Sequence, residues 1–303
     1  MPRSLGGLVA VVGAGVLWGL GGTAAQILFD RYAVEPLYLV VVRLWGAGLL
    51  LTLFLALTRP RSLRLAPGDL GRLAAFGVLG FFIVQFSYFA AIARIGVAMT
   101  TFLQYLGPPM IAAWVTLRDR RPPSAREAAA LALAVAGTLL LVLGAGGLRL
   151  EGLGVALGIL SAVSLAFYTL YAQGLLVRLG PLVMTAYGFL FGALAGTLAW
   201  PLWQGGQGAL GPESLALTAF VVVCGTLLPF ALYVFGLTRL SPTAAGIGAT
   251  AEPLAAALSA LVVLGQSLRG PQYVGGALIV LAMAALAGAR GRRAGRRRES
   301  RSA

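Results

Sequence analysis

Long apolar stretches, separated by short connections that carry the charges, recur along the whole chain and constrain its fold more than any other feature. Hydrophobic residues make up 59% of the 303 positions and charged residues only 11%, whereas a soluble domain carries roughly 25% charged residues. So few charges cannot cover a surface that faces water. We therefore expect an all-α integral membrane protein.

Ten of the apolar stretches have the length of a membrane-spanning helix, because a bilayer core about 30 Å thick needs roughly 20 apolar residues. The connections between them, such as "DRYAVEP" and "RDRRPPSARE", are too short to form a soluble domain. Residues 1–289 are thus expected to form a single transmembrane domain. The predicted spans are 6–28, 37–57, 70–92, 97–117, 127–145, 153–173, 182–203, 214–237, 243–265 and 272–289.

The arginines are unevenly divided between the two sides that these spans define. All 23 basic residues are Arg, and with the N-terminus inside, the predicted outer segments hold only Arg31, Arg94, Arg149 and Arg269. Basic residues gather on the cytoplasmic side of membrane proteins. We expect a multi-pass protein of the plasma (inner) membrane with both termini cytoplasmic, and we interpret the basic tail, 290–303, as an anchor at anionic lipid.

Two segments of the chain match without gaps when one is shifted by 145 residues. The matched pairs are Gly80 with Gly225, Tyr88 with Tyr233, Arg94 with Arg239, and Pro108 with Pro253. This pattern predicts two repeats of five spans, 1–147 and 148–289. Because five is odd, the second repeat is inverted in the membrane, a plan typical of secondary transporters. The alternative is that similar helices recur by chance in an apolar chain.

A glutamate, Glu252, lies near the middle of the predicted ninth span and is followed directly by Pro253. A charged side chain at that depth costs roughly 2.5–3.5 kcal/mol, and the proline removes a backbone hydrogen bond from the preceding turn. We expect this span to border a wet cavity that Glu252 faces, where its carboxylate gains and loses a proton. The alternative is a protonated glutamate that only packs against a neighbouring helix.

Arg43 is the other charged residue well inside a predicted span. It lies toward the outer half, and we interpret it as snorkelling to the surface or pairing with backbone carbonyls. A direct salt bridge to Glu252 is not expected.

Aromatic and amide side chains away from the membrane interfaces complete the candidate substrate-binding site. Gln85 and Tyr88 are three positions apart and share a helix face, as do Phe230 and Tyr233; we expect these pairs to form an outer and an inner constriction. The candidate substrate-binding residues are Trp18, Gln85, Tyr88, Gln104, Tyr168, Phe230, Tyr233 and Glu252.

Three segments carry a resemblance to a known family: "VLWGLGGTAAQIL" in the first span, "VVRLWGAGLLL" in the second and "AEPLAAALSALVVLGQ" in the ninth. They resemble the drug/metabolite transporter superfamily, specifically its EamA-type, ten-span permeases, over essentially the whole chain. One departure is Gln266, which stands where the family usually has an acidic residue. The resemblance implies the export of amino acids, their derivatives or other small metabolites.

The sequence thus predicts a secondary-active transporter that exports small amino-acid-like or other metabolites by alternating access. An importer or exchanger is the alternative within this class, and a channel or scramblase is a rival from another class. The chain holds no His and the single Cys224, so we expect no enzyme, no metal site and no cofactor. The expected partners are a small-molecule substrate and membrane lipid, without nucleic acid; a homodimer stays open.

Overall fold

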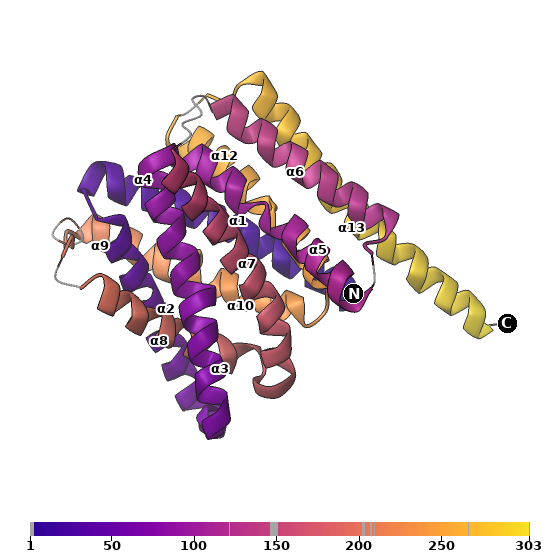
Figure 1. Ribbon diagram of the computed structural model, residues 1–303, viewed down its shortest axis with the longest axis horizontal. Helices are drawn as coiled ribbons and strands as arrows, with labels where there is room; N and C mark the ends of the chain where they lie inside the picture. The colour runs from indigo at the N-terminus through magenta and orange to yellow at the C-terminus, as the bar shows by residue number, and fades with distance from the viewer. Residues whose placement is uncertain are drawn as a thin grey trace.

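The chain forms a bundle of packed helices (Figure 1), and in the part that the structure describes the regular secondary structure is all helical. This computed structural model describes residues 3–120, 122–145, 151–201, 204–206, 208, 210–265 and 267–302. Gln266, predicted to depart from the family pattern, lies outside this set. Side chains are not described at positions 3, 4, 93, 96–98, 145 and 287–302.

Eight helical segments among the described residues are long and apolar enough to cross a membrane, judged by length and composition. A shorter apolar helix covers Gly270–Leu286. The predicted all-helical, multi-pass membrane fold is therefore confirmed. The eight segments are Leu5–Tyr32, Pro36–Thr58, Pro67–Ile92, Ala125–Gly144, Gly152–Leu179, Pro181–Ala199, Pro212–Leu237 and Pro242–Val263.

Prolines set the start of many of these helices. A proline at the first helical position costs little, since the backbone N–H that it lacks has no partner within the helix there. The elements of the first half are α1 (Arg3–Tyr32), α2 (Pro36–Thr58), the short 3-10 helix η1 (Pro60–Leu63), α3 (Pro67–Gly77), the π-helix η2 (Val78–Phe82), α4 (Ile83–Gln104), α5 (Gly107–Asp119) and α6 (Ala125–Ala145).

The second half repeats this order with one extra interruption, between α10 and α11. Ser241 caps α11, because its side chain accepts a hydrogen bond from the N–H of Ala244. The elements are α7 (Gly152–Leu179), α8 (Pro181–Ala199), α9 (Pro212–Val222), the π-helix η4 (Val223–Leu227), α10 (Leu228–Leu237), α11 (Pro242–Ala249), α12 (Ala251–Val263) and α13 (Gly270–Ser302).

Backbone irregularities recur at the spacing at which the two sequence segments match. The π-helical turns Val78–Phe82 and Val223–Leu227 correspond residue for residue at an offset of 145. The helix interruptions at Tyr105 and Thr250 are separated by the same offset. Single π-turns are rare and are frequent at functional sites in helices. The two halves therefore share local backbone features as well as residues.

Helix α4 folds back on itself. The hydroxyls of Tyr88 and Thr101 lie 2.9 Å apart, whereas residues 13 positions apart in a straight helix are separated by about 20 Å along the axis. The chain therefore turns between them, around the connection predicted at 93–96. The predicted span 97–117 is not one helix, since α4 ends at Gln104 and α5 begins at Gly107, with two prolines in its first turn.

Helices α6 and α13 lie side by side along one edge of the bundle (Figure 1). Glycines permit this close approach: a Cβ added at Gly137 would lie 2.7 Å from the carbonyl oxygen of Gly275. Helix α13 extends well beyond the other helices in Figure 1 and runs to Ser302. The predicted boundary between the last span and the tail, at residues 289 and 290, is therefore not a break in the helix.

Candidate functional site

A cluster of aromatic rings fills the centre of the bundle, where α1, α7 and α10 meet. Trp18 packs edge to face on Phe230, with ring centroids 4.9 Å apart, and lies 5.5 Å from Tyr233. Tyr168 lies 5.7 Å and 5.9 Å from the same two rings. These separations are in the range of favourable aromatic pairs. Four of the eight predicted site residues are thus brought together from three helices.

The polar atoms of this aromatic cluster are only partly satisfied. The Tyr233 hydroxyl lies 2.9 Å from the hydroxyl of Thr169. By contrast, the indole nitrogen of Trp18 and the hydroxyl of Tyr168 are buried without a hydrogen-bond partner among the described residues. Buried polar groups are nearly always paired in native proteins. Both groups are therefore donors that the described residues leave without an acceptor.

Glu252 and Tyr105 form the polar part of the site. The Tyr105 hydroxyl donates a hydrogen bond of 2.7 Å to Oε2 of Glu252. Tyr105 comes from the interruption between α4 and α5, and Glu252 lies in the first turn of α12, directly after the interruption at Thr250. The unpaired N–H groups at the start of a helix favour a carboxylate. Two helix interruptions from different halves of the chain thus meet at this pair.

Pro253 explains why Tyr105 is needed at this place. In a regular helix the N–H of residue 253 would donate to the carbonyl of Ala249, but proline has no N–H. The Tyr105 hydroxyl lies 3.2 Å from that carbonyl oxygen and can donate to it. Its single hydrogen is shared between this carbonyl and Glu252.

Glycines in α1 bring that helix against the backbone around Glu252. A Cβ added at Gly19 would lie 2.7 Å from the Glu252 carbonyl oxygen and from the nitrogen of Ala256. At Gly15, a Cβ would lie 3.0 Å from the backbone nitrogen of Glu252. The position of α12 relative to α1 is set by this close contact between backbones.

The snorkelling interpretation expected Arg43 to reach the surface, but the structure buries this residue. Its side chain belongs to α2 and the residue is only 8% exposed, and its Nε has no hydrogen-bond partner among the described residues. It interacts electrostatically with Glu252, although the two form no direct ion pair in the described structure. Helix α2 itself packs against α8 and α9.

The remaining predicted site residues are placed in different ways. Tyr88 bonds to Thr101 across the turn of α4, and its hydroxyl lies in the neighbourhood of Glu252. Gln104 donates a 2.8 Å hydrogen bond to Ser161, which ties α4 to α7. Gln85 is half-buried on α4, and within the described residues it forms no hydrogen bond to the other seven. The structure therefore places Tyr88 near the site and gives Gln104 a packing contact.

Tyr105 was left out of the predicted site and is the residue that the structure adds. Its hydroxyl lies near those of Tyr88 and Tyr233 as well as beside Glu252, so the carboxylate and the aromatic cluster lie close together around it. A signal was present in the sequence. Tyr105 precedes Pro108 by three residues, and at the offset of 145 it corresponds to Thr250, which precedes Pro253 by three.

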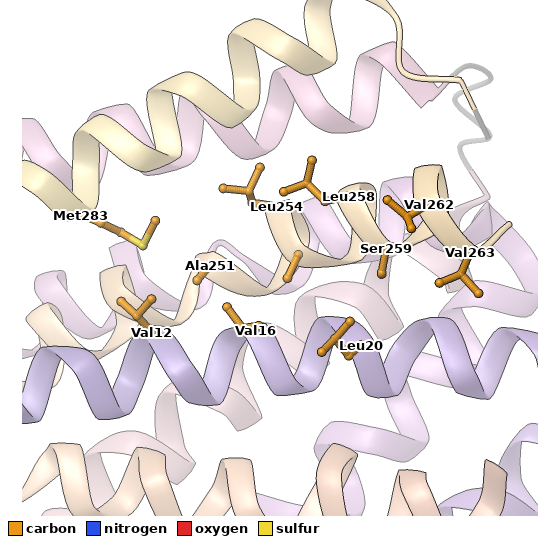
Figure 2. Close-up of a pocket in the computed structure, with 11 residues that line it drawn as sticks. Val12, Val16, Leu20, Ala251, Leu254, Leu258, Ser259, Val262, Val263 and Met283 are labelled. Atoms are coloured by element: carbon orange, nitrogen blue, oxygen red, sulfur yellow. The ribbon is translucent and has the colours of Figure 1, made fainter. Parts of the chain in front are cut away.

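An apolar groove of about 410 Å³ lies on the other side of the contact between α1 and α12 (Figure 2). Its lining includes Val16 and Leu20 of α1 and Leu258 and Val262 of α12, and Met283 of α13 lies at the same end as Val12 in Figure 2. These residues belong to two helical segments that are long and apolar enough to cross a membrane and to the shorter apolar helix Gly270–Leu286. Ser259 is the polar side chain among the described residues that line the groove.

Metal ligands are scarce in this molecule. No group of three or more His, Cys, Asp or Glu side chains that could hold a metal ion occurs among the residues that the structure describes. The chemistry of the central site accordingly rests on one carboxylate, one guanidinium, hydroxyls and aromatic rings.

Comparison with known proteins places this fold and site in a family context. One relative is the "Uncharacterized inner membrane transporter YicL" of Salmonella typhimurium, 32% identical over 278 residues that cover 90% of this chain and 92% of that protein. Another is the "Uncharacterized transporter YwfM" of Bacillus subtilis, 27% identical over 91% of this chain and 92% of that protein.

A solved crystal structure shows the same fold. It matches this chain with a TM-score of 0.77 at 20% sequence identity, and the match covers 92% of this chain and 95% of the other. The EamA-like transporter family matches residues 5–143 and 152–288, which leaves out only the two ends and the link between the halves. The chain therefore belongs to the EamA-like transporter family.

Proposed function

We propose that this membrane transporter is secondary-active and exports small amino-acid-like or other metabolites by alternating access. The observation that carries the proposal is the bond between Tyr105 and Glu252. It places a half-buried carboxylate where helix interruptions of the two halves meet, beside an aromatic cluster with unpaired polar atoms. A carboxylate in such a place is suited to exchange a proton, or a cationic amine of a solute, between the two sides.

The proposal includes ten spans in two inverted repeats, 1–147 and 148–289, followed by the basic tail 290–303. Three observations support it. The sequence segments match at an offset of 145, the π-turns of η2 and η4 match at the same offset, and α4 turns back between Tyr88 and Thr101. Helix interruptions near the midplane of paired repeats are typical binding sites of secondary transporters.

In this mechanism Glu252 holds either a proton or the cationic group of the solute. The aromatic cluster of Trp18, Tyr168, Phe230 and Tyr233 supplies faces and edges for apolar parts of the solute. Arg43, which is buried and interacts electrostatically with Glu252, provides the opposite charge. Tyr105 passes its hydrogen bond between Glu252 and Ala249 as the carboxyl changes its protonation.

The orientation and location proposed are a plasma (inner) membrane with both termini cytoplasmic. The arginine distribution supports this orientation, and one relative is named as an inner membrane transporter. Both relatives described above are named as transporters, which supports a non-enzymatic function.

The test begins with purified protein and a metabolite library. Solutes that raise its Tm are loaded into proteoliposomes, and their efflux is measured with and without a pH gradient. We expect saturable efflux of at least one small amine-bearing metabolite, accelerated when protons can exchange. Non-saturable flux that no solute competes for would instead indicate a channel, and flux in the inward direction only would indicate an importer.

A further inference from the structure

An ion pair connects the two halves of the chain at one end of the bundle. Asp69 lies in the first turn of α3, and its Oδ1 accepts from Nη2 of Arg178 at 3.0 Å and from Nε at 3.1 Å. Arg178 lies in the last turn of α7. The Asp69 side chain is only 7% exposed, so this pair is screened less than a surface pair. The first-half helix α3 is thereby fastened to the second-half helix α7.

A second connection joins the halves at the other end of the bundle. The hydroxyl of Tyr32, the last residue of α1, donates a hydrogen bond to Oε2 of Glu213, which lies in the first turn of α9. Close by, the N–H of Glu35 donates to the carbonyl of Gly205 at 3.1 Å. Here the first-half helix α1 is fastened to the second-half helix α9.

The two connections join corresponding helix ends. At the offset of 145, α1 corresponds to α7 and α3 corresponds to α9. One connection joins the end of α1 to the start of α9, and the other joins the end of α7 to the start of α3. Helix α2 lies between Tyr32 and Asp69 in the chain, and its 23 residues span about 34 Å. The connections therefore lie at opposite faces of the membrane.

We propose that Asp69–Arg178 and Tyr32–Glu213 are two latches, which close the cytoplasmic and the outer face of the central site respectively. The inference rests on the alternating-access function proposed above and adds the residues that hold each face closed. Both latches are formed in the structure, as in a state closed on both sides. The cytoplasmic latch is ionic, whereas the outer latch is a tyrosine–carboxylate bond, so each can be weakened by its own substitution.

Distances between spin labels at each face test the proposal, measured in a Cys224→Ala background. Exposed positions take the labels: Leu70→Cys with Val177→Cys reports the cytoplasmic face, and Asp30→Cys with Leu215→Cys reports the outer face. Arg178→Gln should raise the population with a long cytoplasmic distance about 3- to 10-fold, as expected for the loss of a partly buried ion pair. Tyr32→Phe should lengthen the outer distance instead.

Arg72→Gln is the matched control. Arg72 lies 3.7 Å from the same Oδ1 of Asp69, and its side chain is 50% exposed against 51% for Arg178. Because Arg72 belongs to α3 itself, its loss cannot release α3 from α7, and the cytoplasmic distance should stay unchanged. Asp69→Asn, which keeps the size of the side chain, provides a second variant if Arg178→Gln does not fold.

Three results would overturn the latches: equal changes at both faces, no change at either face, or the same opening with Arg72→Gln as with Arg178→Gln. The distances are measured without any solute, so they do not depend on the transport assay. If the protein transports solute but the substitutions leave the spin-label distances unchanged, the proposed function holds and the latch proposal is wrong. If each substitution changes the distance at its own face but the protein transports no solute, the latch proposal holds and the proposed function is wrong.

Discussion

The hydroxyl of Tyr105 lies 2.7 Å from a carboxylate oxygen of Glu252, although 147 positions separate the two residues in the chain. The same hydroxyl lies 3.2 Å from the Ala249 carbonyl that Pro253 leaves without its helical partner. One tyrosine therefore donates to both an interrupted helix and a half-buried acid. Changes at either residue should affect transport more than they affect insertion into the membrane.

Replacing Glu252 with glutamine should remove proton-coupled transport. Glutamine keeps the shape of the side chain and resembles the protonated acid, but it can neither take up nor release a proton. We expect Glu252→Gln to insert and fold, to lose pH-dependent or uphill transport, and to retain downhill exchange. The measurement is transport in proteoliposomes as a function of pH. Wild-type pH dependence in this variant would show that Glu252 only packs against its neighbours.

Removing the hydroxyl of Tyr105 should destabilise the site. Tyr105→Phe leaves the Ala249 carbonyl and one Glu252 oxygen without their donor, at a cost of about 1–3 kcal/mol. We expect a lower Tm of the purified protein and a shifted pH profile of transport. Tyr171→Phe is the control, since Tyr171 stacks on Phe167 and its hydroxyl has no hydrogen bond among the described residues. Equal effects of the two substitutions would contradict a special role for the Tyr105 hydroxyl.

An added methyl group at Gly19 should disrupt the contact between α1 and α12. In Gly19→Ala the new Cβ would lie 2.7 Å from backbone atoms of Glu252 and Ala256, and overpacking of this kind costs about 1–3 kcal/mol. Gly22→Ala on the same helix meets nothing within 4 Å, so it serves as the matched control. Expression and Tm should fall for the Gly19 variant alone; a Gly22 variant that falls as far would point to helix α1 itself.

Reporter fusions test the orientation. Fusions after residues 120 and 303 should report the cytoplasm, and a fusion after residue 208 should report the outer side, because the basic residues concentrate on the inner segments. An external C-terminus would contradict both the ten-span count and the inversion of the repeats, since ten spans return the chain to the side on which it began.

Some of the site followed from local features of the sequence. Glu252 and Pro253 stand out because an acid and a helix breaker are costly in an apolar span. Trp18, Tyr168, Phe230 and Tyr233 were chosen for their depth in the spans, and the structure brings the four together. Depth along a helix can be counted from the sequence because each residue advances the helix by about 1.5 Å.

Other contacts around the site depend on which way a helix face points, and packing between helices decides that. Gln104 was chosen and Tyr105 was not, yet Gln104 bonds to Ser161 of α7 whereas Tyr105 bonds to Glu252. Neighbouring residues of a helix point about 100° apart, and the interruption at Tyr105 changes that angle further. The sequence likewise defines how deep Arg43 lies along its membrane span. Its burial within the bundle depends instead on the helices that pack around α2.

The sequence by itself determined that the chain is a multi-pass membrane protein, because the cost of placing charge or unpaired backbone in hydrocarbon acts on each segment separately. It also contained the offset of 145 residues, since matched residues can be compared without any contact between them. Only the tertiary structure decided which residues meet Glu252 and which helix ends are fastened together. Contacts such as Tyr105–Glu252 and Asp69–Arg178 join residues more than 100 positions apart. They depend on how glycines and side chains pack the helices, which no single segment specifies.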